Sequence, residues 1–425
     1  MSAAAPSYES FAERVLETGV LQDPWVDGLP RFREEPLILE ERVYTALTQA
    51  SERLARAFDE LCRHLSRHPE HLVSFFRMTA TQRAMWELSA PHWHGIARAD
   101  VFLTNDGPKI CELNCDTPTG HAEAIVLNEL VRDGVRVRFP GARDPNEGFS
   151  ERYLAMVHAL ARALGAAGAS ATVGILYPTE MPEDLAVIRI VRRWLEDAGH
   201  DVVLGSPFNL STADDGSAAL FGEPCGVLLR HYKTDWWGER EPVWDDEAPF
   251  PDALPLLHEL RILAAASLSG RTVIINPFGS VVPQNKRAMA YLWEQRASFS
   301  SETQEAVKDL LPETVRLETL SPEQLVRERA SWVLKSDYGS EGDEVIVGPH
   351  VNDTLWRASV AHATEGRWIA QRYFEALVDE AGETTNHGVY LVAGEAAGIY
   401  TRVQKGATDG HARSVPTLVE QEMRA

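Results

Sequence analysis

Four polar residues on two consecutive predicted strands have the chemistry of a divalent-cation site. Arg98-Ala-Asp100 precedes the turn Asn105-Asp-Gly107, and Glu112-Leu-Asn114 follows it. A glycine-containing turn between two alternating segments predicts a β-hairpin. Residues i and i+2 share one face of a strand, so Arg98 points with Asp100, and Glu112 points with Asn114. Carboxylate and amide oxygens suit Mg²⁺, which usually keeps several waters and shares its other positions with nucleotide phosphates.

A surface hairpin with a cross-strand Arg–Glu ion pair is the alternative interpretation of this segment. The sequence Asp116-Thr117-Pro-Thr119-Gly120 follows the second strand directly. Hydroxyl side chains and a glycine in a loop beside charged residues favour contact with a ligand.

Three later segments carry basic residues that could bind phosphates. Lys286 opens a predicted helix over 286–296, and Lys335 lies on a predicted strand that leads into the loop 339–342. A predicted antiparallel hairpin over 388–402 ends on Arg402. A strand lysine and a glycine-containing loop can contact a triphosphate. Taken singly, each could instead be a solvated lysine, a hairpin turn or a rim charge. The spacing differs from G-x-x-x-x-G-K, which excludes the P-loop class.

In their order along the chain, these segments resemble the synthetase domain of the glutathionylspermidine synthase family, whose members are circularly permuted ATP-grasp ligases. The permutation is visible because the Glu112/Asn114 strand precedes Lys335, whereas the lysine comes first in ordinary ATP-grasp enzymes. The resemblance runs from about residue 86 to 420. This chain has Lys335-Ser336 where the family usually has Lys-Pro, and Glu341 lies in the glycine-containing loop. The cysteine amidase domain of bifunctional members is absent.

The resemblance implies a role for each matching residue. Those that would hold Mg²⁺ are Asp100, Glu112 and Asn114. Those that would act on the transferring phosphate are Arg98 and Arg402. Those that would contact ATP are Lys286, Lys335, Gly339, Ser340, Gly342 and Gln371. Those that would lie near the substrate carboxylate are Thr117 and Thr119.

The function that this resemblance implies is an ATP-dependent carboxylate–amine ligase, which forms an amide through an acyl phosphate and releases ADP. Its partners would be a small-molecule or peptide carboxylate and an amine, with ATP and Mg²⁺ as cofactors. The family's polyamine habit, the net charge of -22 and the acids Asp235 and Glu341 favour a cationic amine. The acids could equally be solvated surface. The alternatives are a non-catalytic nucleotide-binding protein and an ATP-dependent phosphotransferase.

Composition argues against two other classes of function. The 425 residues include 41 basic and 63 acidic side chains, a balance that disfavours a nucleic-acid surface. No apolar run approaches the ~20 residues that span a membrane. The first residues lack the basic and then apolar segments of a secretory signal. The four cysteines form no Cys-x-x-Cys pair, and reduced thiols in a cytoplasmic protein are expected. Nothing in the sequence indicates an oligomeric state.

The surrounding pattern predicts the elements that position these residues. Helical periodicity covers 8–17, 39–67 and most of 120–165. Apolar strands at 171–177, 201–205, 225–230 and 271–276, with a helix over 182–198, predict a parallel βαβ sheet. An aromatic loop over 232–241 is expected to cover a cleft. The resemblance implies an α+β or α/β protein with a circularly permuted ATP-grasp fold and a pre-ATP-grasp-like βαβ subdomain. Three parts are expected, with bounds 1–165 (N-terminal helices and the metal-binding hairpin), 166–265 (the βαβ subdomain) and 266–425 (the lysine and glycine-loop portion).

Overall fold

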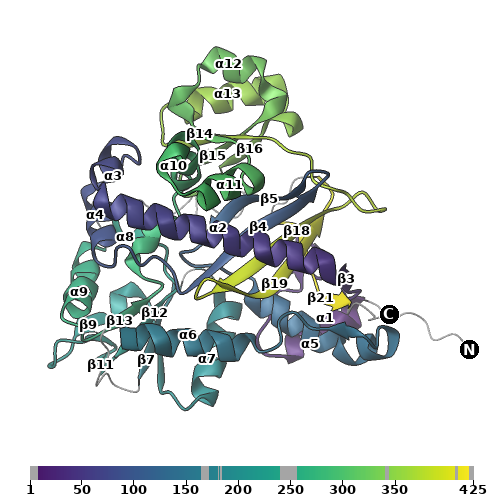
Figure 1. Ribbon diagram of the computed structural model, residues 1–425. Coiled ribbons are helices and arrows are strands. Elements are labelled where there is room, and N and C mark those ends of the chain that lie inside the picture. Colours follow the sequence, from purple (N-terminus) through teal and green to yellow (C-terminus); the bar gives the residue numbers. More distant parts are fainter. Residues whose placement is uncertain are drawn as a thin grey trace, which may run out of the picture.

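The computed structural model shows a mixed α/β protein built around several sheets (Figure 1). It describes residues 8–163, 172–179, 181, 184–239, 256–339, 344–406 and 410–420. None of the helices within these ranges is long and apolar enough to cross a membrane.

The largest sheet is antiparallel, has the strand order β20-β19-β18-β4-β5 and confirms both predicted hairpins. Its strands are β4 (Ile96–Thr104), β5 (Gly107–Asn114), β18 (Thr384–Val392), β19 (Glu395–Gln404) and β20 (Arg413–Val415). Strand β18 pairs with β4, so a C-terminal hairpin extends the sheet that the earlier hairpin begins. Strands from the first and third predicted parts of the chain therefore form this sheet together.

Helices cover both faces of this sheet, because its strands alternate between two apolar sets. Val101, Val389 and Ile399 pack with residues of α2 (Glu41–Arg67), the long helix across the middle of Figure 1. Tyr390 and Tyr400 point the other way, toward α5 (His121–Arg138) and α6 (Phe149–Ala163). This alternation is the expected consequence of the period of two along a strand.

A parallel sheet with the order β13-β12-β7-β8 confirms the predicted βαβ unit. Its strands are β7 (Val173–Leu176), β8 (Val202–Gly205), β12 (Val227–Arg230) and β13 (Val273–Ile275). Helix α7 (Leu185–Asp197) connects β7 to β8, and α9 (Leu257–Leu268) packs against β13. Gly199 follows α7 with a φ of +87°, a left-handed conformation that glycine adopts easily and that ends the helix.

The lobe at the top of Figure 1, here called the upper lobe, carries Lys335. Its antiparallel sheet has the order β14-β17-β15-β16. The elements are β14 (Thr314–Arg316), α12 (Pro322–Arg327), β15 (Trp332–Ser336), β16 (Val345–Val347), α13 (Asp353–Ala363) and β17 (Trp368–Arg372). Three tryptophans, Trp332, Trp356 and Trp368, form much of its separate core. The predicted strand–loop–strand around Lys335 is confirmed, since β15 and β16 pair.

Further described elements surround these sheets. They are α1 (Tyr8–Glu17), β1 (Trp25–Val26), β2 (Leu29–Pro30), β3 (Leu37–Glu40), α3 (Glu70–Ser74), α4 (Ala80–Glu87), β6 (Ala142–Arg143), β9 (Leu210–Thr212), β10 (Ala218–Leu220), β11 (Glu223–Pro224), α8 (Trp236–Glu239), α10 (Arg287–Glu294), α11 (Ser301–Leu310) and β21 (Thr417–Glu420). Lys286 is the N-cap of α10, as the sequence predicted. The boundary expected near residue 165 lies outside the described residues, and the three-part division stays a prediction.

Candidate active site

An ion-paired cluster lies on the α5/α6 face of the antiparallel sheet. Nε and Nη2 of Arg98 donate to the two carboxylate oxygens of Asp100, at 2.7 and 3.1 Å. Nη2 of Arg402 donates to Oδ2 of the same carboxylate at 3.0 Å. The two catalytic arginines that the resemblance implied therefore meet at one predicted metal ligand. Arg98 and Asp100 lie on β4, and Arg402 lies on β19. Their side chains meet across β18, the strand between them.

Burial sharpens the electrostatics of this cluster. Arg98 and Asp100 are only 7% and 4% exposed. Burial by itself would raise the pKa of Asp100, but Arg98 and Arg402 hold that pKa below its ordinary value. Burial likewise opposes the charge of Arg98, and the Asp100 carboxylate reverses this effect and raises the pKa of Arg98. Both groups are therefore charged at neutral pH.

Strand β18 supplies two residues that contact this cluster, a glycine that leaves space for Arg98 and an asparagine that binds Asp100. Gly388 lies opposite Asp100, and a Cβ atom at Gly388 would lie 2.8 Å from Cδ of Arg98, so a side chain would displace the arginine. Nδ2 of Asn386 donates to Oδ2 of Asp100 at 3.4 Å. Oδ1 of Asn386 is buried and has no hydrogen-bond partner among the described residues. Sequence reasoning missed Asn386; its only signal was its position two residues before the glycine at the start of the predicted hairpin.

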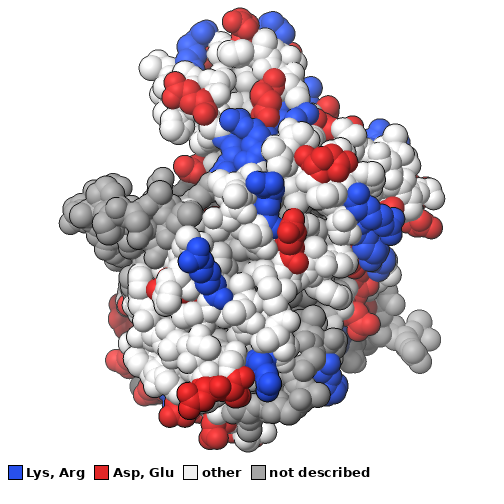
Figure 2. All heavy atoms as spheres, turned by 90° about the vertical axis from the view of Figure 1, so that its left-hand side faces the viewer, with Lys and Arg blue, Asp and Glu red and all other residues white. Residues whose placement is uncertain are grey.

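Two lysines from other elements contact β5. Nζ of Lys286 lies 3.3 Å from Oε1 of Glu112. Nζ of Lys335, on β15, donates to the carbonyl of Cys111 at 3.0 Å. Strand β5 is thus the meeting point of the two lysines predicted to bind a nucleotide. Figure 2 shows Lys and Arg side chains gathered where the upper lobe joins the rest of the protein, despite the net charge of -22.

The three predicted metal ligands lie together and offer the donors that a hard cation prefers. Asp100 and Glu112 are directly opposite each other in the β4–β5 register. With its amide oriented to satisfy both neighbours, Asn114 donates to Glu112 at 3.3 Å and accepts from Arg98 at 3.2 Å. The described part of the chain holds no group of three His, Cys, Asp or Glu side chains able to bind a metal. Carboxylate and amide oxygens of this kind fit a Mg²⁺ that takes part of its shell from phosphates and water, while both oxygens of Asp100 now accept from Arg98, and one also accepts from Arg402.

The other predicted site residues differ in how directly they reach this region. The Gly339 carbonyl accepts a hydrogen bond from Lys286. Nε2 of Gln371 donates to Oγ1 of Thr314 at 3.0 Å inside the upper lobe, on the sheet face that Lys335 shares. The Thr119 carbonyl accepts from Nη1 of Arg98 at 2.8 Å. Ser340 and Gly342 lie outside the described residues.

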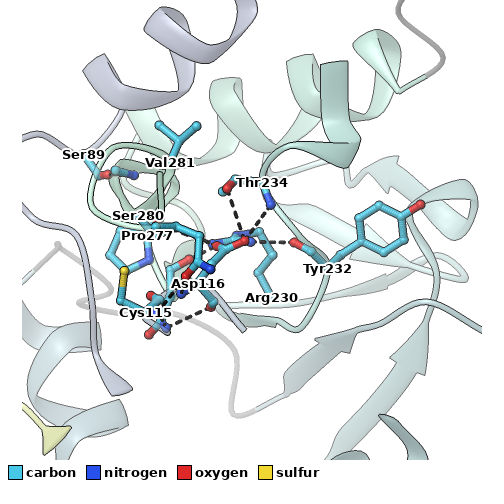
Figure 3. Close-up of polar contacts among 12 residues, drawn as sticks. Ser89, Cys115, Asp116, Arg230, Tyr232, Thr234, Pro277, Ser280 and Val281 are labelled. Atoms are coloured by element: carbon cyan, nitrogen blue, oxygen red, sulfur yellow. Dashed lines mark hydrogen bonds and ion pairs between the residues drawn. The ribbon is translucent and has the colours of Figure 1, made fainter. Parts of the chain in front are cut away.

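Thr117 borders a second, deeper cluster of polar side chains that is drawn in Figure 3. Nη2 of Arg230, at the end of β12, donates to Oδ1 of Asp116 and to Oγ of Ser280. Oδ2 of Asp116 accepts from the backbone N–H of Thr234 at 2.7 Å and from its hydroxyl at 3.1 Å. The side chains of Arg230 and Asp116 are 0% and 2% exposed. This cluster joins the β5 exit loop to the parallel sheet.

Amide side chains fix the same loop through its backbone. Oδ1 of Asn276 accepts from the N–H of Gly95 at 2.7 Å, and its Nδ2 donates to the carbonyls of Cys115 and Asp116, each at 3.0 Å. Oε1 of Gln284 accepts from the N–H groups of Cys115 and Asp116 at 2.9 and 3.1 Å. The loop that carries Thr117 and Thr119 therefore starts from a rigid position.

The expected aromatic cover over a cleft is wrong for the described part of that loop. Tyr232 and Trp237 are 1% and 0% exposed, and Trp237 packs edge-on against Phe278. These rings belong to the core because burying large aromatic surfaces is strongly favourable. Burial raises the pKa of Asp235 to about 7; Lys233 opposes this effect and Asp116 adds to it.

Comparisons with known proteins agree with this architecture. A family model described as glutathionylspermidine synthase preATP-grasp matches residues 13–420. No curated protein matches the chain. Among solved structures, a glutathione synthetase-like effector from Globodera pallida has 11% identity and a TM-score of 0.55, with 97% of this chain and 98% of the other covered. A putative gamma-glutamylcysteine synthetase from Methylobacillus flagellatus has 12% identity and a TM-score of 0.49, with 90% and 89% covered. The predicted ATP-grasp fold is confirmed.

Proposed function

Because this chain belongs to the glutathionylspermidine synthase preATP-grasp family, we propose that it is an ATP-dependent ligase that joins a carboxylate to an amine. An oxygen of the substrate carboxylate attacks the γ-phosphorus of ATP, which gives an acyl phosphate and ADP. The amine nitrogen then attacks the acyl carbon, phosphate leaves, and the nitrogen loses a proton to give the amide.

The observation that carries this proposal is the convergence of three cations on one hairpin. Arg402 contacts Asp100, Lys286 contacts Glu112, and Lys335 contacts the backbone of β5. These cations come from three separate segments of the chain. The reaction brings an anionic carboxylate against an anionic phosphate, and fixed positive charge stabilises the charge that develops.

We assign each of these residues a role in the reaction from its contacts. In this proposal, Lys286 and Lys335 bind phosphate oxygens in place of their present partners on β5. Arg98 is held by Asp100 and by the Thr119 carbonyl, so it is suited to fixing the substrate carboxylate. The Arg402 side chain is 21% exposed and can turn from Asp100 toward the transferring phosphate.

Magnesium would be held by Glu112 and Asn114, joined by Asp100. Bound there, it would neutralise phosphate charge and polarise the transferring group. The Glu112 side chain is 23% exposed, which keeps one ligand of this set open to an arriving nucleotide.

The amine substrate is proposed to be cationic, for example a polyamine. The net charge of -22 favours the approach of cations, and Asp235 lies within electrostatic reach of Asp116 and Asp337 near the same loop. Burial raises the pKa of Asp235 to about 7, and a carboxylate with such a pKa can also accept the proton that the attacking amine loses.

A non-catalytic nucleotide-binding protein is the second candidate. The observation that favours it is that both oxygens of Asp100 are already bound by arginines. A phosphotransferase would use the same cations without an amine.

An ADP-release screen over pooled carboxylates and amines separates these functions. The ligase requires both substrates for sustained ADP release. A carboxylate or alcohol alone would suffice for a phosphotransferase, and ATP binding without ADP release would indicate the non-catalytic protein. Lys335→Ala should reduce ATP binding in the same assay, and Lys109→Ala is its matched control, because Lys109 is on the same hairpin but donates to the Asp309 carbonyl. Absence of any ATP binding would contradict the proposal.

A further inference from the structure

A small cavity lies behind the loop that carries Thr117, next to the candidate active site. Its volume is about 40 Å³. Apolar side chains at the ends of the parallel strands and on α7 form most of its wall; they are Ile175, Leu229, Ile275, Val187, Ile188 and Val191. Thr117 and Pro118 form the side toward the arginine cluster.

One polar side chain in this wall is left without partners. His121 is 2% exposed, and neither of its ring nitrogens has a hydrogen-bond partner among the described residues. Two neighbouring polar groups are satisfied, because Arg230 binds Asp116 and Asn276 binds backbone groups. Nε2 of His231, also in the wall, has no hydrogen-bond partner among the described residues but lies 3.4 Å from Oδ2 of Asp184. A neutral imidazole has one donor and one acceptor, and burying both unpaired is costly. The cavity is therefore shaped for a polar guest.

The electrostatics indicate that this guest is uncharged. Burial, with the nearby charges of His231 and Arg98, lowers the pKa of His121 to about 3, so the imidazole is neutral at ordinary pH. Arg230, the one guanidinium in the wall, is neutralised by Asp116. A charged end group would lose its hydration here, and the cationic groups in the wall, Arg230 and His231, already face the carboxylates of Asp116 and Asp184.

We propose that this cavity binds the far end of the carboxylate substrate, and that this end is a small neutral amide on a short aliphatic stem. The assignment rests on the ligase function proposed above. An amide supplies the acceptor and donor that His121 lacks, and the stem contacts the apolar wall. Thr117 lines the cavity, and the carbonyl of Thr119, two residues along, is bound by Arg98. A substrate lying along this loop would therefore place its carboxylate at Arg98. The volume admits only a few heavy atoms, since one water needs ~10–15 Å³.

Binding of propionamide, with propionate as its charged isostere, tests this assignment without any turnover. The His121 ring resonances are followed by NMR in the full-length protein. Propionamide should shift them saturably, and propionate should not. His121→Leu should weaken propionamide binding about tenfold, whereas His121→Gln, which keeps a donor and an acceptor, should retain most of it. His94→Leu is the matched control, since the His94 Nδ1 is also buried without a partner but lies outside the cavity wall. Equal binding of the two probes, or unmoved His121 resonances, would show that the cavity holds only water and would overturn the assignment.

Steady-state kinetics then connect the cavity to the substrate. Among carboxylates that support ADP release, those with a neutral amide end should have a KM about tenfold lower than those with an acidic end. His121→Leu should remove this preference by raising the KM of the amide-ended substrates about tenfold. ADP release without such a preference would overturn the cavity assignment and leave the ligase intact. Propionamide binding without ADP release from any pair would instead overturn the ligase proposal and leave a site for neutral amides.

Discussion

Two arginine–aspartate clusters lie on either side of one short loop, and they differ in exposure and in the balance of their charges. In the first, Arg98 and Arg402 share the buried carboxylate of Asp100, and the Arg402 side chain is 21% exposed. In the second, Arg230 and Asp116 are 0% and 2% exposed. Both oxygens of each carboxylate accept hydrogen bonds from the protein, but Asp116 faces one guanidinium and Asp100 faces two.

The difference shows how the same residue types serve two purposes. In a fully buried pair of one cation and one anion the charges are balanced, and removing one partner strands the other charge. The Arg98 cluster has two cations for one carboxylate and neighbours two lysines whose present partners a phosphate can replace. We therefore assign the Asp116–Arg230 cluster to the scaffold and the Arg98 cluster to the reaction.

The largest expected effect follows from breaking the buried pair. Asp116→Ala should lower the free energy of unfolding by about 3–5 kcal/mol, because Arg230 would remain buried without a counter-charge. Chemical denaturation measures this loss. Asp106→Ala, in the exposed hairpin turn, is the control and should change little. A loss under about 1 kcal/mol would remove the scaffold assignment.

If Lys335 binds the nucleotide and Arg402 acts on the transferring phosphate, as proposed, loss of Lys335 should affect ATP affinity and loss of Arg402 should affect turnover. Lys335→Ala removes a charge-assisted contact and should weaken ATP binding by about 1.5–3 kcal/mol. Arg402→Ala should leave ATP affinity largely intact and reduce turnover. Calorimetry with ATP and Mg²⁺, followed by ADP-release assays, compares the two variants. Equal loss of affinity in both would contradict this division of roles.

Buried histidines should make the protein acid-sensitive. Burial lowers the pKa of His387 to about 4, whereas the unfolded chain has a value of about 6.5. Between these values the unfolded state binds the extra proton, so stability is complete above pH ~6.5 and falls as pH falls toward 4. Each such histidine contributes a slope of about 1.4 kcal/mol per pH unit. Denaturation curves of wild type and His387→Gln should therefore converge toward pH 4, and parallel pH profiles would speak against this effect.

The smallest expected effect concerns electrostatic attraction of the amine. If acidic residues raise its local concentration, the KM for a diamine should increase a few-fold between ~50 and ~500 mM salt, because screening shortens the reach of the charges. The KM for a neutral amino acid amide serves as the control. A salt-insensitive KM, or a preference for neutral amines, would remove the cationic-amine hypothesis.

Local patterns predicted most of the secondary structure that positions the site. The alternation around Asn105-Asp-Gly107 predicted β4 and β5, and four apolar runs predicted the parallel sheet. The shared face of Arg98 and Asp100 followed from the strand period alone. The resemblance, rather than any spacing, indicated that Lys335 and Arg402 belong with this hairpin.

Contacts between segments that lie far apart in the sequence could not be predicted from local patterns. The pairing of β18 with β4 determines that Asn386 touches Asp100, yet the two residues are far apart in sequence. Arg230 gave no sign that it would pair with Asp116. The 232–239 segment was misplaced because aromatic residues near a predicted strand end are compatible with either a cover or a core, and only packing decides between them.

Glu112→Ala, with turnover and thermal midpoint measured on the same sample, tests most directly whether the hairpin cluster is catalytic. Glu112 is partly exposed and paired with Lys286 across the junction with α10. The account predicts a loss of about 10²-fold or more in ATP turnover, with a thermal midpoint close to that of wild type. Wild-type turnover in this variant, or a midpoint many degrees lower, would show that the cluster is a structural ion pair and would contradict the account.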